Sequence, residues 1–350
     1  MEDGGAFGSA KIDPGGPVVA GDRGTWRVVY TVGERGMAPG GAIRIRPPQR
    51  GMVRWQVGLV TAEASRPGTT CRVELTNCHP ISTHWRQAPI VQVDVLGERL
   101  EPGDTVSVTL GERGGYSRGY YIRAQAPEHA HRGAIWDIWA DVEGNKSAPP
   151  ESAVNDPWVQ LEAAYTDIIG GPAARLSVAA RQVLPVADRT RVVVAARDRF
   201  GNHSEAYDGQ ISVIGAEEDL SETVRGGKAE LAAPLAQDRV TRYTAFDAAS
   251  EIIGTSNAVA PGFGDIAGHA VYFGDLHVMT GEGIIAGALE GTEYAYRWGR
   301  DIAGLDFCVA TNNLSCWDRD MPLDDLYNSP GEFVTIPAYE VGFKIGHKNV

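Results

Sequence analysis

Three apolar runs of the sequence are each followed by polar side chains of the kinds that bind metal ions. The residues at their ends are Asp275 and His277, then Asn312 and Asn313, and finally Glu340, with His347 shortly after. A strand that ends in a carboxylate and an imidazole is a common way to present metal ligands. In parallel α/β folds, polar residues at the carboxyl ends of successive strands converge on one site. We therefore expect these side chains to meet at one end of a sheet.

A helix is expected between the first two runs. Residues 292–303 have an amphipathic pattern, with Thr292 as the N-cap and Gly304 as the residue that stops the helix. Three large side chains recur every four positions and are expected to face the sheet: Tyr294, Trp298 and Ile302.

The runs around this helix indicate a strand–helix–strand unit. A right-handed crossover would place a strand at residues 305–310 beside a strand at residues 271–276. His277 and Asn313 would then emerge at the same end of the sheet. A further strand is expected at residues 333–339.

These residues carry a resemblance to a known superfamily. The segment Asp275-Leu-His277-Val-Met279-Thr resembles the Asp-Leu-His-x-His-Thr motif that opens the PHP (polymerase and histidinol phosphatase) superfamily, and Thr311-Asn-Asn313 stands where that superfamily has Thr-Asp-His. The nearer resemblance is to a domain-of-unknown-function family of large PHP-like proteins with N-terminal β-domains. It covers residues 272–277, 295–307, 337–340 and 346–350. The resemblance implies a β/α (TIM-like) barrel with a metal site at its mouth.

The resemblance also implies which residues hold the metal. His277 matches the first histidine of the opening motif, and Glu340 and His347 match residues of the third segment. Asp275 matches the family aspartate, which could orient His277. Three protein ligands are typical of catalytic zinc sites, so zinc, manganese or iron is the expected cofactor. The implied activity is a metal-dependent hydrolase in which Asp275, His277 and Glu340 are catalytic. Metal-activated water would attack a phosphoester or amide-type bond of a small-molecule substrate.

Three positions depart from the family pattern. Met279 and Asn313 stand where the family has histidine, and Asn312 stands where it has aspartate. A thioether is a poor ligand for hard divalent metals. The alternative is therefore a non-catalytic structural or binding subunit that keeps the PHP-like fold without its metal site. In that case His277 and His347 would be satisfied core histidines.

The first two thirds of the chain have the patterns of β-domains. The period-two alternation of strands with one buried face recurs at residues 26–32, 71–77, 91–95 and 106–110. Further strands are predicted at residues 174–180, 191–197 and 210–214. Residues 146–152 have the composition of a linker. We therefore predict a flexible arm over residues 1–24, a β-sandwich-like domain over 25–150, an immunoglobulin-like β domain over 151–255 and the N-terminal part of a PHP-like β/α barrel over 256–350.

Patterns in the β-domains have both functional and structural interpretations. His129 and His131 could hold a metal, but no strand or helix signal surrounds them, which favours a solvated loop. Asp198 and Asn202 could bind calcium, but such residues in turns usually cap their own backbone. Two aromatic-rich segments could bind a ring compound, although sandwich core is the favoured interpretation: residues 116–121 and 135–141.

Bulk composition narrows the class of partner and the compartment. The 350 residues are 43% hydrophobic and 22% charged, as in soluble globular proteins, and the net charge is -13. This acidity disfavours nucleic acid and an anionic membrane surface, which need a basic footprint. No run is long enough to span a bilayer, and the N-terminus is unlike a signal peptide. The four cysteines form no Cys-x-x-Cys pair, so reduced thiols in a cytoplasmic protein are expected.

The number of β/α units leads us to expect a partner chain. The region after residue 256 supplies about three such units, whereas a closed barrel needs about seven or eight. An open parallel sheet would expose unpaired backbone and an apolar edge. The alternatives are a truncated product and one half of a split protein. We favour the second, in which another polypeptide completes the barrel and the metal site across an apolar interface.

Overall fold

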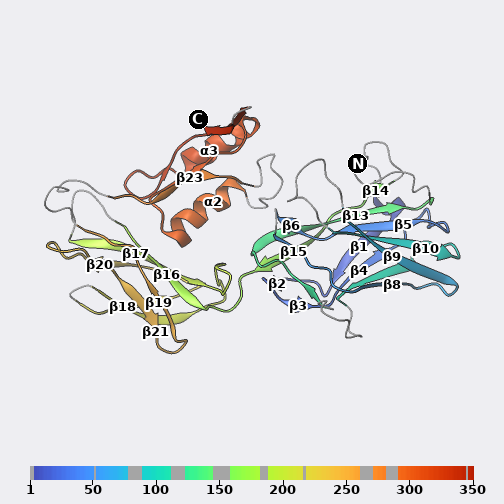
Figure 1. The fold of residues 1–350 in the computed structure, drawn as a ribbon, viewed down its shortest axis with the longest axis horizontal. Helices are drawn as coiled ribbons and strands as arrows, with labels where there is room; N and C mark the ends of the chain where they lie inside the picture. The colour runs from blue at the N-terminus through green and yellow to red at the C-terminus, as the bar shows by residue number, and fades with distance from the viewer. Residues whose placement is uncertain are drawn as a thin grey trace. The chain divides into compact units, whose positions relative to one another are not determined.

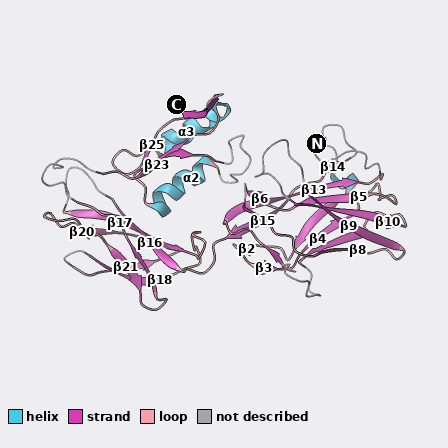
Figure 2. Ribbon diagram, in the orientation of Figure 1, coloured by secondary structure: helices cyan, strands magenta, loops and turns pink. Residues whose placement is uncertain are grey.

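The computed structural model places the chain in two compact units, Met1–Ile168 and Ile169–Val350. The residues that it describes are 4–50, 53–77, 89–111, 123–144, 158–181, 188–215, 218–260, 271–280, 291–343 and 346–350. Strands predominate in both units, and the longer helices belong to the C-terminal part of the chain (Figures 1 and 2). The protein is therefore mostly β-sheet, as the sequence patterns predicted.

The first unit is a β-sandwich of two antiparallel sheets. The smaller sheet has the order β1 (Ser9–Asp13), β4 (Trp26–Thr31), β11 (Thr105–Leu110) and β8 (Val60–Ala64). The larger has the order β2 (Val18–Val19), β15 (Ala164–Ile169), β13 (His131–Asp141), β5 (Ala42–Arg46), β10 (Pro89–Gly97) and β9 (Thr69–Asn77), with β14 (Val159–Gln160) also paired to β13. The remaining elements are the short helix α1 (Gly4–Phe7) and the strand pairs β3 (Arg23–Gly24) with β12 (Ala124–Gln125) and β6 (Gln49–Arg50) with β7 (Val53–Arg54).

Alternate side chains of the two sheets form a single core. At its centre Trp55 and Trp136 are both buried, and their ring centroids lie 4.9 Å apart. Trp26 meets Trp55 edge-on at 4.7 Å. Trp136 also donates from Nε1 to Oγ1 of Thr166 at 3.0 Å, which satisfies its buried polar group. The aromatic segment 135–141 therefore contributes to sandwich core.

The N-terminal residues belong to this sandwich, so the flexible arm predicted over residues 1–24 is wrong. Strand β1 pairs with β4 from Ser9 opposite Thr31 to Asp13 opposite Arg27. The unit also extends to Ile168, beyond the predicted boundary at residue 150, because β15 pairs with β13. Glycine and proline here mark turns between short strands, a composition that disordered segments share.

The second unit begins with a seven-stranded antiparallel sandwich of immunoglobulin-like size. One sheet has the order β16 (Arg175–Ala180), β17 (Arg189–Arg197) and β20 (Lys228–Pro234). The other has the order β19 (Leu220–Val224), β18 (Gly209–Ile214), β21 (Thr244–Asp247) and β22 (Ile252–Thr255). The core between them includes Leu176, Val192, Val194, Ile211 and Tyr243. We call this part the second sandwich.

A small α/β part follows within the same unit. Its parallel sheet has the order β23 (Gly274–Val278), β24 (Phe307–Ala310) and β25 (Val334–Thr335). Between them lie α2 (Thr292–Trp298) with the π-helix η3 (Gly299–Ala303), and the 3-10 turn η4 (Leu314–Cys316) with α3 (Trp317–Tyr327). The hairpin β26 (Glu340–Phe343) and β27 (Gly346–Asn349) comes last. The parallel pairing of β23 and β24 was expected, whereas the described residues contain three parallel strands and no closed barrel.

The helix packs on this sheet with a different face from the one predicted. The core of the α/β part consists of Tyr296, Cys308, Ala310 and Phe333. Tyr294 is exposed and Trp298 is half-buried. Tyr294, Tyr296 and Trp298 all lie in α2, before the π-helix begins at Gly299, and the face of α2 that packs on the sheet is the one that carries Tyr296. Gly304 ends the helix at a left-handed φ of 67°, as predicted, whereas Gly291 is the N-cap in place of Thr292.

Candidate functional site

His277 and Glu340 come together at the carboxyl ends of the parallel strands. Nε2 of His277 lies 3.5 Å from Oε1 of Glu340. The imidazole side chain is 50% exposed, whereas the carboxylate side chain is 7% exposed. The pair therefore joins a buried acid to an imidazole that is open to solvent.

Backbone pairing between three segments fixes this meeting point. The amide of Thr311 donates to the carbonyl of Val278 at 2.8 Å, and the amide of Glu340 donates to the carbonyl of Asn312 at 3.0 Å. Asn313 and Glu340 also form an isolated parallel bridge. The end of β23, the end of β24 and the start of β26 consequently lie side by side.

Asp275 holds His277 through the backbone. The ladder between β23 and β24 shifts register between Asp275 and Val278, which is a β-bulge. Within the bulge, the amide of His277 donates to Oδ1 of Asp275 at 2.9 Å. This contact fixes the main chain at His277 and does not involve the imidazole, so the role of Asp275 in orienting the ring stays a prediction.

The strand position of His347 is defined, whereas its side chain lies outside the part of the chain that is described. Residue 347 pairs with Gly342 in the β26–β27 hairpin. The hairpin starts at Glu340, and Asn349 donates from Nδ2 to the carbonyl of Leu276 at 3.3 Å. The backbone at His347 thus belongs to the element that adjoins the end of β23.

Asn312 is a structural residue in this arrangement. Its Oδ1 accepts from the amide of Thr280 at 2.9 Å. Its Nδ2 lies 2.8 Å from Oγ1 of Thr280, 3.1 Å from Oγ1 of Thr292 and 2.8 Å from Oδ2 of Asp320. The side chain is buried and is occupied in joining the end of β24 to β23, α2 and α3. The polar atoms of Asn312 are therefore engaged in internal hydrogen bonds and are not placed as metal ligands.

Asp320 is the site residue that the sequence did not reveal. It is buried on α3 and accepts from Thr292 Oγ1 at 2.9 Å as well as from Asn312. One signal was available: an asparagine at the end of an apolar strand needs a nearby acceptor for its two N–H groups. That signal does not say which acid is the acceptor.

Met279 and Asn313 follow the ends of β23 and β24. Both are half-buried. Sδ of Met279 lies 3.9 Å from Oγ1 of Thr311, a weak contact for a thioether. Asn313 lies beside Glu340 through the parallel bridge. Both positions therefore neighbour the His277–Glu340 pair along the backbone.

The distance between Nε2 of His277 and Oε1 of Glu340 is close to the distance between two ligands of a tetrahedral zinc ion. Two ligands at about 2.0–2.1 Å from a tetrahedral zinc lie about 3.4 Å from each other, close to the observed 3.5 Å. A direct hydrogen bond would be about 2.7–3.2 Å long. The pair is at ion-pair distance, and the same spacing would suit two ligands of one ion. The described residues contain no group of three His, Cys, Asp or Glu side chains that could hold a metal, so any third ligand comes from outside that set.

The candidate sites in the β-domains have structural roles. His131 begins β13 and is buried, so the solvated loop predicted for it is wrong. Asp198 accepts from the amides of Gly171, Phe200 and Asn202 and from Nδ2 of Asn202, at 2.8–3.0 Å. Burial alone would raise the pKa of Asp198, but these hydrogen bonds hold it below its ordinary value. The turn therefore caps its own backbone, as favoured.

The described cysteines are free thiols. Burial raises the pKa of Cys71 to about 11 and that of Cys308 to about 12. Thiols with such pKa values remain protonated near neutral pH and are poor nucleophiles. Cys78 and the aromatic segment 116–121 lie outside the described residues.

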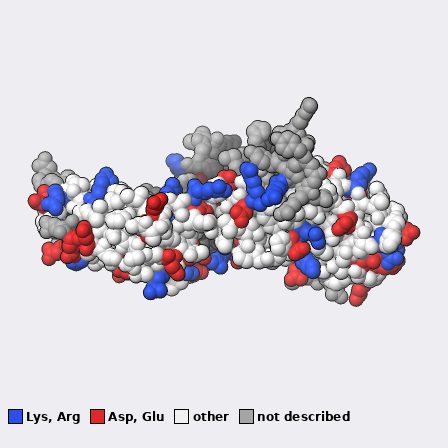
Figure 3. Space-filling model, turned by 90° about the horizontal axis from the view of Figure 1, so that it is seen from below, with Lys and Arg blue, Asp and Glu red and all other residues white. Residues whose placement is uncertain are grey.

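Charges of both signs are interspersed on the surface. Figure 3 shows Lys and Arg among Asp and Glu side chains on the visible face. In the described stretches, no helix is both long enough and apolar enough to cross a membrane.

Comparisons with known proteins do not assign this chain to a family. No family model matches this chain, and no curated protein matches it. Among solved structures, the D0-D1 domain of intimin aligns at 9% identity over 72% of this chain and 96% of that one, with a TM-score of 0.20. A putative membrane anchored protein from Corynebacterium diphtheriae aligns at 12% identity over 72% of this chain and 53% of that one, also with a TM-score of 0.20. Alignments this loose support no conclusion about fold or function.

Proposed function

We propose that this chain is a metal-dependent hydrolase-like protein whose site lies at the carboxyl ends of an incomplete PHP-like β/α barrel. The observation that carries the proposal is the His277–Glu340 pair, with donor atoms 3.5 Å apart. His347 is the proposed third ligand because its hairpin starts at Glu340 and adjoins β23.

Glu340, His277 and Asp275 each have a distinct role in this proposal. Glu340 supplies carboxylate oxygens from a largely buried position, which suits a ligand of a divalent cation. His277 supplies a borderline nitrogen ligand and is exposed enough to leave access for water and substrate. Asp275 holds the bulge that aims His277. A bound zinc, manganese or iron ion would activate water and polarise a phosphoester or amide-type bond.

Zinc binding by the purified chain tests the proposal. We expect about one zinc per chain by calorimetry and metal analysis, and at least tenfold weaker binding in His277→Ala and Glu340→Gln. The matched control is His129→Ala, which removes an exposed histidine far along the sequence and should bind zinc as the parent does. Metal-free protein whose melting temperature is indifferent to chelators and to added zinc would refute the proposal.

One observation favours a second candidate, a non-catalytic structural or binding subunit. Asn312 replaces the superfamily aspartate and is wholly engaged in internal hydrogen bonds. A strand end that is held by such hydrogen bonds can be stable without a bound metal ion. Zinc binding without hydrolysis of any phosphoester or amide in a substrate panel would favour this candidate.

The exposed edge of β23 supports the proposed partner chain. Tyr272, Phe273 and Leu276 are between 44% and 60% exposed, and β23 pairs on one side only among the described strands. An apolar strand with one free edge is a template for another strand. The occupant we propose is a second polypeptide that adds parallel β/α elements at β23.

A further inference from the structure

Asp306 ties together the amino ends of all three parallel strands. Its amide donates to the carbonyl of Phe273 at 2.7 Å, and its carbonyl accepts from the amide of Val334 at 2.9 Å. Its Oδ2 accepts from the amide of Phe273 at 2.8 Å. Phe273 immediately precedes β23, so one residue fixes the start of the strand that carries Asp275 and His277.

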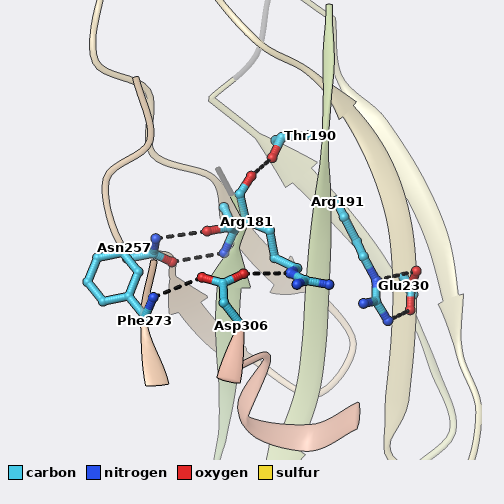
Figure 4. A network of polar contacts seen from close by, with 8 residues as sticks. Arg181, Thr190, Arg191, Glu230, Asn257, Phe273 and Asp306 are labelled. Atoms are coloured by element: carbon cyan, nitrogen blue, oxygen red, sulfur yellow. Dashed lines mark hydrogen bonds and ion pairs between the residues drawn. The ribbon is translucent and has the colours of Figure 1, made fainter. Parts of the chain in front are cut away.

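The second oxygen of Asp306 is held from the second sandwich. Arg181, at the end of β16, donates from Nε to Oδ1 of Asp306 at 2.7 Å (Figure 4). Both side chains are less than a tenth exposed. A buried carboxylate without this partner would be costly, so the pair is obligatory for this packing.

The sandwich holds Arg181 firmly in turn. The amide of Arg181 donates to the carbonyl of Arg191 at 2.9 Å, and Thr190 donates from Oγ1 to the carbonyl of Arg181. Asn257 brackets the preceding residue, Ala180, with one bond to its amide and one to its carbonyl, at 2.9 and 2.8 Å. Figure 4 shows these bonds converging around Arg181. The guanidinium is therefore presented by a rigid strand end.

A second set of contacts joins the helix to the same sheet of the sandwich. The guanidinium carbon of Arg197, on β17, lies 4.7 Å from the ring centroid of Trp298, and Nη2 approaches the carbonyl of Ile302 at 3.4 Å. Burial lowers the pKa of Arg197. Gly304 approaches so closely that a Cβ there would lie 2.5 Å from Cβ of Ala179. The sandwich therefore contacts both the sheet and the helix of the α/β part.

We propose that Arg181 and Asp306 are positioning residues for the candidate site, and that the second sandwich is the scaffold that sets where β23 lies. The connection runs from Arg181 through Asp306 to Phe273, and then along four residues of strand, about 13 Å, to His277. The functional consequence rests on the proposed metal site, whereas the effect on β23 does not. Rigid support of a ligand-bearing strand is what a preorganised site requires.

Local amide exchange tests this assignment on the full chain. The main variant is the double substitution Arg181→Met with Asp306→Asn, which removes both charges together and leaves no unpaired buried ion. We expect amides of Phe273 and β23 to exchange at least tenfold faster, while those of β17 and β20 keep their protection. Zinc affinity should fall by about tenfold. Arg181→Lys, which keeps the charge but loses the planar donor, should give smaller changes of the same kind.

The matched control is a surface pair on the same sandwich. Arg191 and Glu230 form a bidentate ion pair between β17 and β20, and both are more exposed than the buried pair (Figure 4). Arg191→Met with Glu230→Gln should leave β23 exchange and zinc affinity unchanged.

The outcomes separate the two proposals. Unchanged β23 exchange in the Arg181/Asp306 double variant overturns the positioning role, as does a uniform rise across all amides of the second unit, which would mean only global destabilisation. Faster β23 exchange in a protein that never binds zinc supports the positioning role and overturns the proposed metal site.

Discussion

At the scale of single residues, the polar side chains at the strand ends divide into two groups. The side chain of Asn312 stabilises the fold, because its amide forms hydrogen bonds to three neighbouring elements. His277 keeps half of its side-chain surface exposed beside Glu340. Residue types and strand ends were enough to predict the meeting of His277 with Glu340. They could not distinguish a metal ligand from a structural amide at Asn312, because that depends on how α3 packs and places Asp320 against the amide.

Histidines at positions 279 and 313 should strengthen metal binding. Met279→His with Asn313→His would add two imidazoles next to the His277–Glu340 pair, each a good ligand for zinc. We expect zinc affinity to rise by about tenfold or more, measured by calorimetry. Met279→Leu with Asn313→Gln, which adds no ligand, is the control. Equal affinities in the two double variants would show that these positions do not reach a common ion.

The turn at Asp198 gives a pH dependence with a defined sign. Its pKa is lowered from 3.8, so the ionised carboxylate stabilises the fold above about pH 3.8 and that contribution disappears as the pH falls through the lowered pKa. Asp198→Asn should therefore lose about 1–3 kcal/mol of unfolding free energy at pH 7, the range for hydrogen bonds to a charged group. The difference from the parent should shrink in urea melts below pH 3.8. Asp238→Asn, at an exposed position, is the control, and a gap that widened on acidification would contradict this account.

At the scale of elements, the helix and strand positions were predictable and the packing face was not. Residues 292–303 are helical, and Gly304 stops them, because those signals are local. The buried face depends on how α2 docks on the sheet, which buries Tyr296 and leaves Tyr294 exposed. The spacing of large side chains in the sequence does not determine that docking, because residues 292–303 carry apolar and aromatic side chains on more than one face.

Substituting Tyr296 or Trp298 by alanine should show which of the two side chains contributes more to the free energy of unfolding. Tyr296 is fully buried, and its hydroxyl donates to Asp324, whose pKa is raised by burial. Tyr296→Ala should cost about 3–5 kcal/mol of unfolding free energy, whereas half-buried Trp298→Ala should cost about 1–2 kcal/mol. Denaturant melts of both variants measure this order. A larger loss for Trp298→Ala would restore the originally predicted face.

At the scale of the whole molecule, strand patterns in the sequence predicted two sandwiches. Pairing between strands that are far apart in the sequence determines where each sandwich begins and ends. The strand patterns at residues 26–32 and 191–197 correspond to β4 and β17. The joining of β1 to β4 and of β15 to β13 was not predictable, because the pattern within a strand does not say which distant segment it pairs with. The barrel expected from the PHP resemblance stays a prediction beyond the three parallel strands described.

The exposed edge of β23 predicts how the lone chain behaves in solution. Leu276 is 60% exposed on that edge, so the chain should self-associate at high concentration, and Leu276→Lys should reduce this in sedimentation experiments. Leu326→Lys is the control, because Leu326 is 72% exposed but lies on helix α3. Co-expression with the neighbouring reading frame should yield a complex with β23 protected from exchange. A strictly monomeric lone chain that is unaffected by the neighbour would defeat the partner proposal.

The buried amide of Asn312 also sets the order in which mutations can accumulate. Replacing it by the superfamily aspartate would oppose two carboxylates where Nδ2 and Oδ2 of Asp320 now lie 2.8 Å apart. Two buried like charges at that distance cannot both ionise without a large penalty. Neutralisation of Asp320 would have to come first or at the same time. A lineage, or an engineer, that moves between asparagine and aspartate at position 312 must therefore exchange positions 312 and 320 as a pair.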